Sequence, residues 1–418
     1  MGGGLLQLVA YGAQDVYLTG NPQITFFKVV YRRHTNFALE SIQQTFNGSV
    51  SFGQRVTATI SRNGDLISRT YLVMSCNTDD FNNTAVPYLG LRAIKTAEVE
   101  IGGQKIDKHY SDWMYIWNEL SLPVGKKEGY YKMVGGAGGD VKGKMYVPLE
   151  FWFCRNIGLA LPLIALQYHE VKITIEFASG DDCSLDGTIS GLKAELWVDY
   201  IYLDTDERRK FAQSSHEYLI EQLQFTGKES VSSGDTAKVK LNFNHPVKEL
   251  VWVAHQGRAN NSNVCWMNYT SEALLNEHLF DYDNNSNSII NSYEKISQML
   301  GPNNSNMFNQ ISSAKLILNG NDRFYARDGD YFNLVQPFQH HENVPNNRGI
   351  NVYSFALKPE EHQPSGTLNM SRIDTATLDL EFDKTTEDKN KPGELSIYAV
   401  NYNVLRILSG MGGIAYSN

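Results

Sequence analysis

The amino-acid sequence resembles itself, because four short strings from its first half return in its second half in the same order. The paired strings contain Phe46 and Phe225, Ala97 and Ala314, Phe177 and Phe382, and Glu195 and Glu394. Strands often resemble one another, so each match alone is weak. Four matches in one order indicate that a structural unit occurs twice. Any fold for this chain must therefore contain two similar halves.

Each half is dominated by apolar and polar residues that alternate with a period of two, which is typical of half-buried strands. This alternation occurs at 54–60, 97–101, 170–177, 192–202, 237–243 and 377–382. Turn signals such as Asn319-Gly320 separate these segments. Helical periodicity is rare, and we expect helices only at 111–120 and 205–213. Many short strands with few helices predict sandwiches or barrels.

The repeat and the strand pattern together predict an all-β protein with two β-sandwiches in tandem. We place them at residues 38–203 and 217–407. An N-terminal arm at 1–37 precedes them, a linker at 204–216 joins them, and a C-terminal tail at 408–418 follows them.

The two copies differ in the lengths of their loops. The second copy is longer between its early and middle strands, and the extra residues fall at 257–313, which is rich in Asn and Ser. We expect this segment to be a long outer loop, since long loops in compact domains lie at the surface. The first copy has its own extra segment at 125–144, which is rich in Gly and Lys. We expect a loop there as well.

Composition excludes several classes of protein. The chain has 418 residues, of which 42% are hydrophobic and 20% charged, as in ordinary globular proteins. Its formal net charge of −9 argues against a protein that coats nucleic acid. The four cysteines form no C-x-x-C pair, which predicts isolated reduced thiols rather than a disulfide framework or a zinc site.

Several strings imitate sites of chemistry but lack an essential part. Residues 138–144 fit the phosphate-binding pattern G-x-x-x-x-G-K, yet Met145 stands where Ser or Thr should hold Mg²⁺. His340-His341-Glu342 and Glu361-His362 lack zinc-like spacing, so we interpret them as surface or interface polar residues. We therefore predict no catalytic residue, no cofactor and no bound metal.

The arm carries the candidate interface residues. They combine aromatic and basic side chains, and they are Phe26, Phe27, Arg32, Arg33 and Phe37. Such a mixture can bind single-stranded nucleic acid. The acidic remainder of the chain instead favours contact with a neighbouring subunit or an internal scaffold, and no direct role with nucleic acid.

Two longer strings resemble a known family. NPQITFFKVVYRRHTNF at 21–37 and FALKPEEHQPSGTLNMSRID at 355–374 are similar to signatures of major capsid proteins from nucleocytoplasmic large DNA viruses. That group includes iridoviruses, phycodnaviruses, marseilleviruses and mimiviruses. The resemblance implies a double jelly roll: two tandem eight-stranded jelly-roll β-sandwiches with short helices and long surface loops.

The resemblance also implies a structural role in the virion. Family members trimerise into a pseudo-hexameric capsomer that tiles an icosahedral shell, and they are assembled in the host cytoplasm. The implied partners are a homotrimer, neighbouring capsomers, minor capsid and penton proteins, and the inner viral membrane beneath the shell. The arm is then expected to face the particle interior, and 257–313 to face outward.

A protein of another class remains as the alternative. A carbohydrate-binding or glycoside-cleaving β-sandwich would need exposed aromatic platforms for sugars. The candidates are the six tryptophans, Trp113, Trp117, Trp152, Trp197, Trp252 and Trp266.

Overall fold

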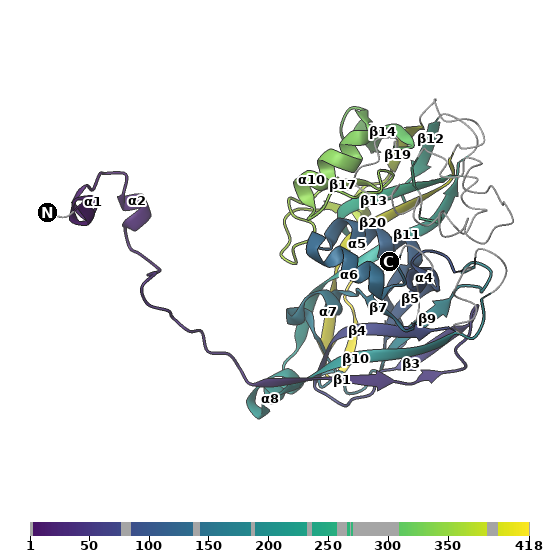
Figure 1. Ribbon diagram of the computed structural model, residues 1–418, viewed down its shortest axis with the longest axis horizontal. Helices are drawn as coiled ribbons and strands as arrows, with labels where there is room; N and C mark the ends of the chain where they lie inside the picture. The colour runs from purple at the N-terminus through teal and green to yellow at the C-terminus, as the bar shows by residue number, and fades with distance from the viewer. Residues whose placement is uncertain are drawn as a thin grey trace. The chain divides into compact units, whose positions relative to one another are not determined.

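The protein is represented by a computed structural model (Figure 1). The structure describes residues 3–76, 85–136, 143–184, 189–231, 236–256, 266–267, 269–270, 309–382 and 392–417. The chain divides into two compact units, Met1–Phe37 and Ala38–Asn418.

The first unit consists of two short helices and extended chain. The helices are α1 (Gly3–Val9) and α2 (Val16–Thr19), and neither contains a buried residue. Asp15 stabilises the turn before α2, where its carboxylate accepts a hydrogen bond from the Gly12 amide at 2.6 Å. Residues 20–36 form neither helix nor strand.

The second unit begins with a sandwich of two sheets, here called the first roll. One sheet has the order β1 (Phe37–Gln44), β10 (Lys193–Leu203), β4 (Leu66–Ser75) and β7 (Met145–Leu149), with β8 (Leu161–Pro162) beside β4. The other has the order β2 (Phe46–Asn47), β3 (Arg55–Thr59), β9 (Val171–Phe177), β5 (Ile94–Ile101) and β6 (Gln104–Tyr110).

A second sandwich, here called the second roll, follows. One sheet has the order β11 (His216–Ser230), β20 (Pro392–Leu408), β13 (Pro246–Gln256) and β17 (Asn351–Ser354), with β18 (Leu368–Asn369) and β21 (Met411–Ile414) added. The other has the order β12 (Thr236–Lys240), β19 (Ala376–Phe382), β14 (Ile311–Leu318) and β15 (Asn321–Asp322), with β16 (Arg327–Asp328) beside β14.

The two rolls have one topology. The eight principal strands along the chain are β1, β3, β4, β5, β6, β7, β9 and β10 in the first roll, and β11, β12, β13, β14, β15, β17, β19 and β20 in the second. Numbered in that order, one sheet has the order 1-8-3-6 and the other 2-7-4-5 in both rolls. This is the strand order of a jelly roll, and the predicted double jelly roll is confirmed.

The predicted repeat is confirmed at single residues. Phe177 ends β9 and pairs with Ile94, the first residue of β5. Phe382 ends β19 and pairs with Ile311, the first residue of β14. Both phenylalanines are buried.

The hairpins that follow β5 and β14 also correspond. Gly102 and Gly103 have φ of 58° and 85°, and Asn319 and Gly320 have φ of 48° and 79°. A two-residue hairpin turn with positive φ at both positions favours Gly and Asn, which are the residues present.

The prediction that Phe46 and Phe225 occupy equivalent places is wrong, because the two residues pair with strands that do not correspond. Phe46 pairs with Ala58 of β3, whereas Phe225 pairs with Tyr398 of β20. The first roll interrupts its strand at Thr45, so Phe46 has already crossed to the other sheet. In the second roll the corresponding strand, β11, continues to Ser230.

The predicted helices are present, and one predicted loop is wrong. The helices α5 (Ser111–Ser121) and α8 (Thr205–Gln213) lie where expected. The segment 125–144 is not all loop, because α6 (Val124–Met133) occupies its first half. Buried Tyr130 anchors this helix, and an ion pair joins Glu128 to Lys132 across one turn at 2.6 Å. These contacts offset the low helix propensity of its glycines.

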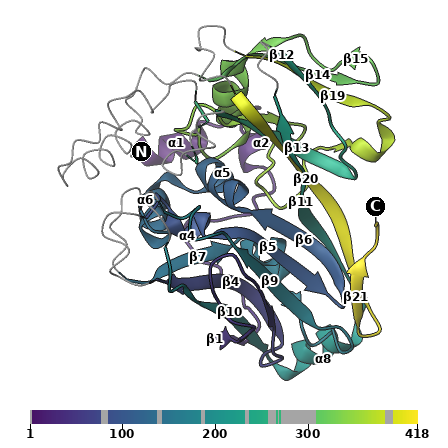
Figure 2. The ribbon, with the colours of Figure 1, turned by 90° about the vertical axis from the view of Figure 1, so that its right-hand side faces the viewer.

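Smaller elements complete the second unit. They are α4 (Leu89–Arg92), α7 (Trp152–Arg155), η2 (Ile157–Leu159), the π-helical turn η5 (Tyr331–Val335), α10 (Gln336–His340) and η6 (Met370–Arg372). Strand β21 pairs with the end of β20 and lies beside β6 of the first roll (Figure 2). Most of 257–313 lies outside the described residues.

The middle of the sheet β11-β20-β13-β17, at β13, is buried on both faces. In β13, Leu250 and Trp252 face the core of the second roll, while Val251 and Val253 belong to the larger core that includes the first roll. Burial on both sides explains why Leu250–Ala254 is a continuous apolar run rather than an alternating one. This sheet is the plane along which the two rolls meet.

We expect Phe382→Ala to lower the free energy of unfolding by about 3–5 kcal/mol, since it leaves a cavity in a packed core. Phe177→Ala should cost a similar amount because the site is equivalent. Urea denaturation measures both. Tyr325→Ala is the control, since Tyr325 is 87% exposed and its loss should change the free energy by less than about 0.5 kcal/mol. A cost below about 1 kcal/mol for Phe382→Ala would contradict the assignment.

Candidate assembly surfaces

The interface between the two rolls is centred on α5. This helix lies between the rolls in both views (Figures 1 and 2). Trp113 of α5 packs on Tyr398 of β20 with ring centroids 5.3 Å apart. Tyr398 pairs with Val251 of β13, which pairs in turn with Val352 of β17. All four residues are buried, so this row of side chains is covered by the first roll.

A chain of charges crosses the same interface. Arg155 of α7 contacts Glu221 of β11 at 2.9 Å, and the other oxygen of Glu221 lies 2.8 Å from the ammonium group of Lys248 in β13. Lys248 is 0% exposed and also donates to the Pro359 carbonyl at 2.5 Å. Trp117 of α5 lies under the Arg155 guanidinium at 4.3 Å. A buried charge is tolerated only when it is paired in this way.

A second buried cluster adjoins the first. His341, which follows α10, lies 3.1 Å from Glu249 and 2.7 Å from Glu360. Its side chain is fully buried, so the interpretation of His341 as a surface residue is wrong. Neighbouring His340 is partly exposed and lies 2.9 Å from the Leu357 carbonyl oxygen. Sequence spacing missed the cluster because its members come from three separate segments.

The pKa values of this cluster favour the ionised pair. Burial opposes the positive charge of His341, but Glu249 and then Glu360 raise its pKa to about 9. Burial likewise opposes the carboxylate of Glu249, but His341 and then Lys248 hold the pKa of Glu249 below its ordinary value. Both groups are therefore charged at neutral pH. The sequence did carry one signal, since Lys248-Glu249 interrupts an otherwise apolar strand.

Backbone groups add fixed contacts between the rolls. The Leu223 amide of β11 donates to the Asp107 carboxylate of β6 at 3.0 Å, and the neighbouring Gln222 side chain donates to the Ile106 carbonyl. The Asn343 amide donates to the Leu120 carbonyl at 3.0 Å. These bonds, together with the charges, hold the two rolls in one arrangement.

A groove of about 960 Å³ opens beside α5 and α6 on the first roll. The strands β4, β7 and β10 form one wall. The lining includes Tyr71, Tyr146, Met133, Leu122, Arg69 and Glu360. It is more apolar than polar, as is usual for surfaces that take a side chain or ligand.

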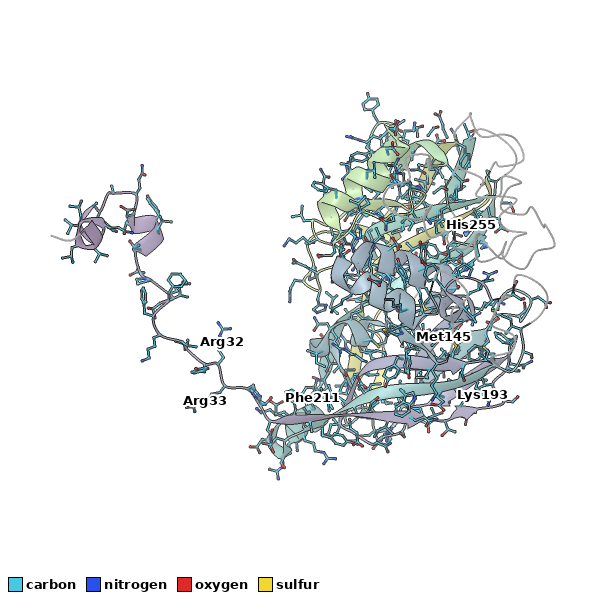
Figure 3. The ribbon with its side chains drawn as sticks, in the orientation of Figure 1. Arg32, Arg33, Met145, Lys193, Phe211 and His255 are labelled. Atoms are coloured by element: carbon cyan, nitrogen blue, oxygen red, sulfur yellow. The ribbon has the colours of Figure 1, made fainter. Side chains whose placement is uncertain are left out.

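The candidate residues of the arm share an extended segment. Phe26, Phe27, Arg32 and Arg33 are all exposed, and Figure 3 labels the two arginines. Phe37 begins β1 and lies against His34 with ring centroids 6.2 Å apart. The structure gives these residues no enclosed site, so their role in assembly stays a prediction.

The tryptophans do not form sugar platforms. Five of the six are buried, namely Trp113, Trp117, Trp152, Trp252 and Trp266, and Trp197 is half-buried. A stacked sugar requires an open ring face. Burial of these rings therefore argues against the carbohydrate-binding alternative.

Other predicted features have the following positions. Cys154 and Cys183 are free thiols, and burial raises the pKa of Cys154 to about 12. Residues 138–142 of the phosphate-loop string lie outside the described residues.

In the ranges given above, no three His, Cys, Asp or Glu side chains group as metal ligands. No helix in those same ranges is long and apolar enough to cross a membrane.

The fold and the rigid interface define a class of protein: tandem jelly-roll shell proteins, in which two sandwiches act as one block. Comparison with known proteins agrees with this class. Residues 25–204 match the family described as "Major capsid protein N-terminus". Residues 207–413 match the family described as "Large eukaryotic DNA virus major capsid protein".

Whole-chain relatives carry the same description. The chain is 52% identical to the major capsid protein of Pyramimonas orientalis virus and 46% identical to that of Paramecium bursaria Chlorella virus 1, with 100% of each chain covered. A solved chain of the PBCV-1 virus capsid is similar with a TM-score of 0.79 and 40% identity, over 94% of this chain and 100% of that one. The Faustovirus major capsid protein, at 14% identity and a TM-score of 0.72 over 95% and 94% of the two chains, shares the fold.

The chain belongs to the major capsid proteins of large eukaryotic DNA viruses. It is a structural protein of the virion shell and not an enzyme.

We expect the His341 cluster to make stability depend on pH. The pKa of His341 is raised in the folded state, so its contribution is complete below about pH 6.5 and is lost as pH rises through about 9. Between these values the free energy of unfolding should fall by about 3 kcal/mol more in the wild type than in His341→Gln. The contribution of Glu249, whose pKa is lowered, should be lost only as pH falls below about 4.5.

Urea denaturation at a series of pH values measures this difference. His34→Gln, an exposed histidine of the arm, is the matched control and should follow the wild-type curve. Parallel curves for wild type and His341→Gln from pH 6.5 to 9 would contradict the assigned ion pairs.

Proposed function

We propose that three copies of this chain form a capsomer with six similar lobes, which tiles the icosahedral shell of a large DNA virus. In this proposal residues 38–203 and 217–407 are the two lobes of each copy, and 204–216 is the linker. The observation that carries the proposal is the identical strand order of the two rolls, which are joined by the ion pair of Arg155 with Glu221. Two equivalent lobes per chain allow a threefold ring to approximate sixfold symmetry.

We further propose how the capsomer meets its partners. The apolar and basic arm at 1–37 faces the particle interior, where it contacts neighbouring capsomers, minor capsid and penton proteins or the inner viral membrane. Leaving its exposed side chains in water would be unfavourable by about 25 cal/mol per Å² of apolar surface. The segment 257–313 faces outward, and assembly takes place in the host cytoplasm.

We expect purified protein to be a trimer. Sedimentation equilibrium should give a mass three times the 47.1 kDa of the chain, independent of concentration in the micromolar range. Permanent interfaces of this type bury upwards of about 2,000 Å², which gives such stability. A monomer at all concentrations would contradict the proposal.

We expect limited proteolysis to separate the outer segment from the arm. In intact particles, cleavage should occur first within 257–313 and spare 1–37, because the shell protects the arm. Isolated trimers should lose the arm readily, since exposed termini are preferred sites of cleavage. Mass spectrometry of the fragments identifies the sites, and early loss of the arm from intact particles would reverse the proposed orientation.

A further inference from the structure

The interface inside the chain pairs two kinds of surface. One is the outer face of the second roll's sheet, where Tyr398, Val251 and Val352 lie side by side on three strands. The other is α5, in the connection between the fifth and sixth principal strands of the first roll, which places Trp113 on Tyr398. Because the two rolls have one topology, each roll has a position for a candidate surface of each kind.

The first roll repeats the sheet surface. Tyr71 of β4 pairs with Trp197 of β10 on one side and with Pro148 of β7 on the other. This row occupies the strands that correspond to those of Tyr398, Val251 and Val352.

The burial of the two rows differs. The row in the second roll is buried, whereas Tyr71, Trp197 and Pro148 are only half-buried. Tyr146 lies two positions before Pro148 on β7, so its side chain is on the same face, and it is 41% exposed. A groove separates this row from the ends of α5 and α6, whereas α5 packs directly on the counterpart row in the second roll. An aromatic sheet face of this kind is a contact surface without its partner.

The second roll repeats the helical surface. Its connection between the fifth and sixth principal strands contains η5 and α10, in the place that α5 occupies in the first roll. Val335 and Phe338 are 39% and 79% exposed, and their spacing of three residues puts them on one helix face. Exposed Leu357 lies at the end of α10, where its carbonyl is 2.9 Å from the His340 ring. A phenylalanine this exposed indicates a second contact surface whose partner is not within the chain.

We propose that Val335 and Phe338 of one copy pack on Tyr71, Tyr146 and Trp197 of the next copy in the trimer. This contact would repeat between chains the arrangement that α5 and the second roll's sheet make within a chain. It rests on the proposed trimer and names the surfaces that form it. A contact between two different surfaces propagates around a ring, and three copies close the ring.

The groove beside the sheet suits this occupant. Tyr71 and Tyr146 line it, with Met133 of α6 and Leu122, the residue after α5, also in the lining. Its volume of about 960 Å³ can accept a phenylalanine ring. Aromatic side chains held in pockets are the residues that contribute most to the affinity of such interfaces.

Charged substitutions test the surfaces separately. Phe338→Asp and Tyr146→Asp should each raise the trimer dissociation constant by more than about 30-fold, as expected for a central contact residue. Tyr325→Asp is the matched control, since Tyr325 is an exposed aromatic between β15 and β16 and should leave the constant unchanged. Analytical ultracentrifugation measures the constants, and circular dichroism checks that each variant is folded.

Cross-linking tests the pairing itself. The double variant Phe338→Cys with Tyr146→Cys, treated with a short bismaleimide, should give covalent dimers and trimers on a denaturing gel. Each single variant and the wild type, with its native cysteines, should remain monomeric on that gel.

The outcomes separate the two proposals. A wild-type protein that is a monomer refutes the trimer itself. If the wild type is a trimer, the proposed contact surfaces are refuted by a double variant that gives no covalent oligomer. They are also refuted if both aspartate variants keep the wild-type dissociation constant.

Discussion

The arrangement of the two rolls depends on the ion pair between Arg155 of the first roll and Glu221 of the second, at 2.9 Å. The other oxygen of Glu221 is held within the second roll by the fully buried ammonium group of Lys248, which also donates to the Pro359 carbonyl. Moving one roll against the other would separate Arg155 from Glu221 at a largely buried interface, which is unfavourable. The cluster therefore selects a single relative position, whereas apolar contacts alone would tolerate small shifts. Stiffness of this kind is what a shell subunit needs, because errors in the angle between lobes add up around a closed surface.

The sheets β1-β10-β4-β7 and β11-β20-β13-β17 have the same topology but lie in different environments. In the second roll the outer row at Val251 is buried by α5, whereas in the first roll the row at Tyr71 is half-exposed. The sequence reflects this difference. Strand β13 is continuously apolar from Leu250 to Ala254, while β10 alternates and places Trp197 and Asp199 on its outer face. A tandem repeat in which each unit covers the next must leave its first unit uncovered until another molecule supplies the cover.

The strands and their repeat could be predicted from the sequence because both depend on local periodicity. Strand β19 and helix α8 lie within a residue of their predicted limits, and Phe177 and Phe382 occupy equivalent places. The failures have a common origin in contacts between distant segments. Glycines at 125 and 129 suggested a loop, but the burial of Tyr130 stabilises α6. The buried ion pair of His341 with Glu249 joins residues almost a hundred positions apart, which no spacing rule detects. The candidate residues of the arm were chosen for their mixture of aromatic and basic side chains, and their role stays a prediction.

The other outer faces of the rolls restrict how the subunit can associate. On the sheet β2-β3-β9-β5-β6, Glu98 is contacted by Arg55, Lys105 and Lys108 at 2.8, 3.1 and 2.9 Å. On the matching sheet of the second roll, Lys238 pairs with Asp379 at 3.2 Å. Charges that are already paired on their own sheet gain little from a new partner, and desolvating them is unfavourable. These faces therefore favour solvent, which supports the proposed association through the aromatic row and the end of α10. Confining attraction to one complementary pair of surfaces favours a closed ring over an open aggregate.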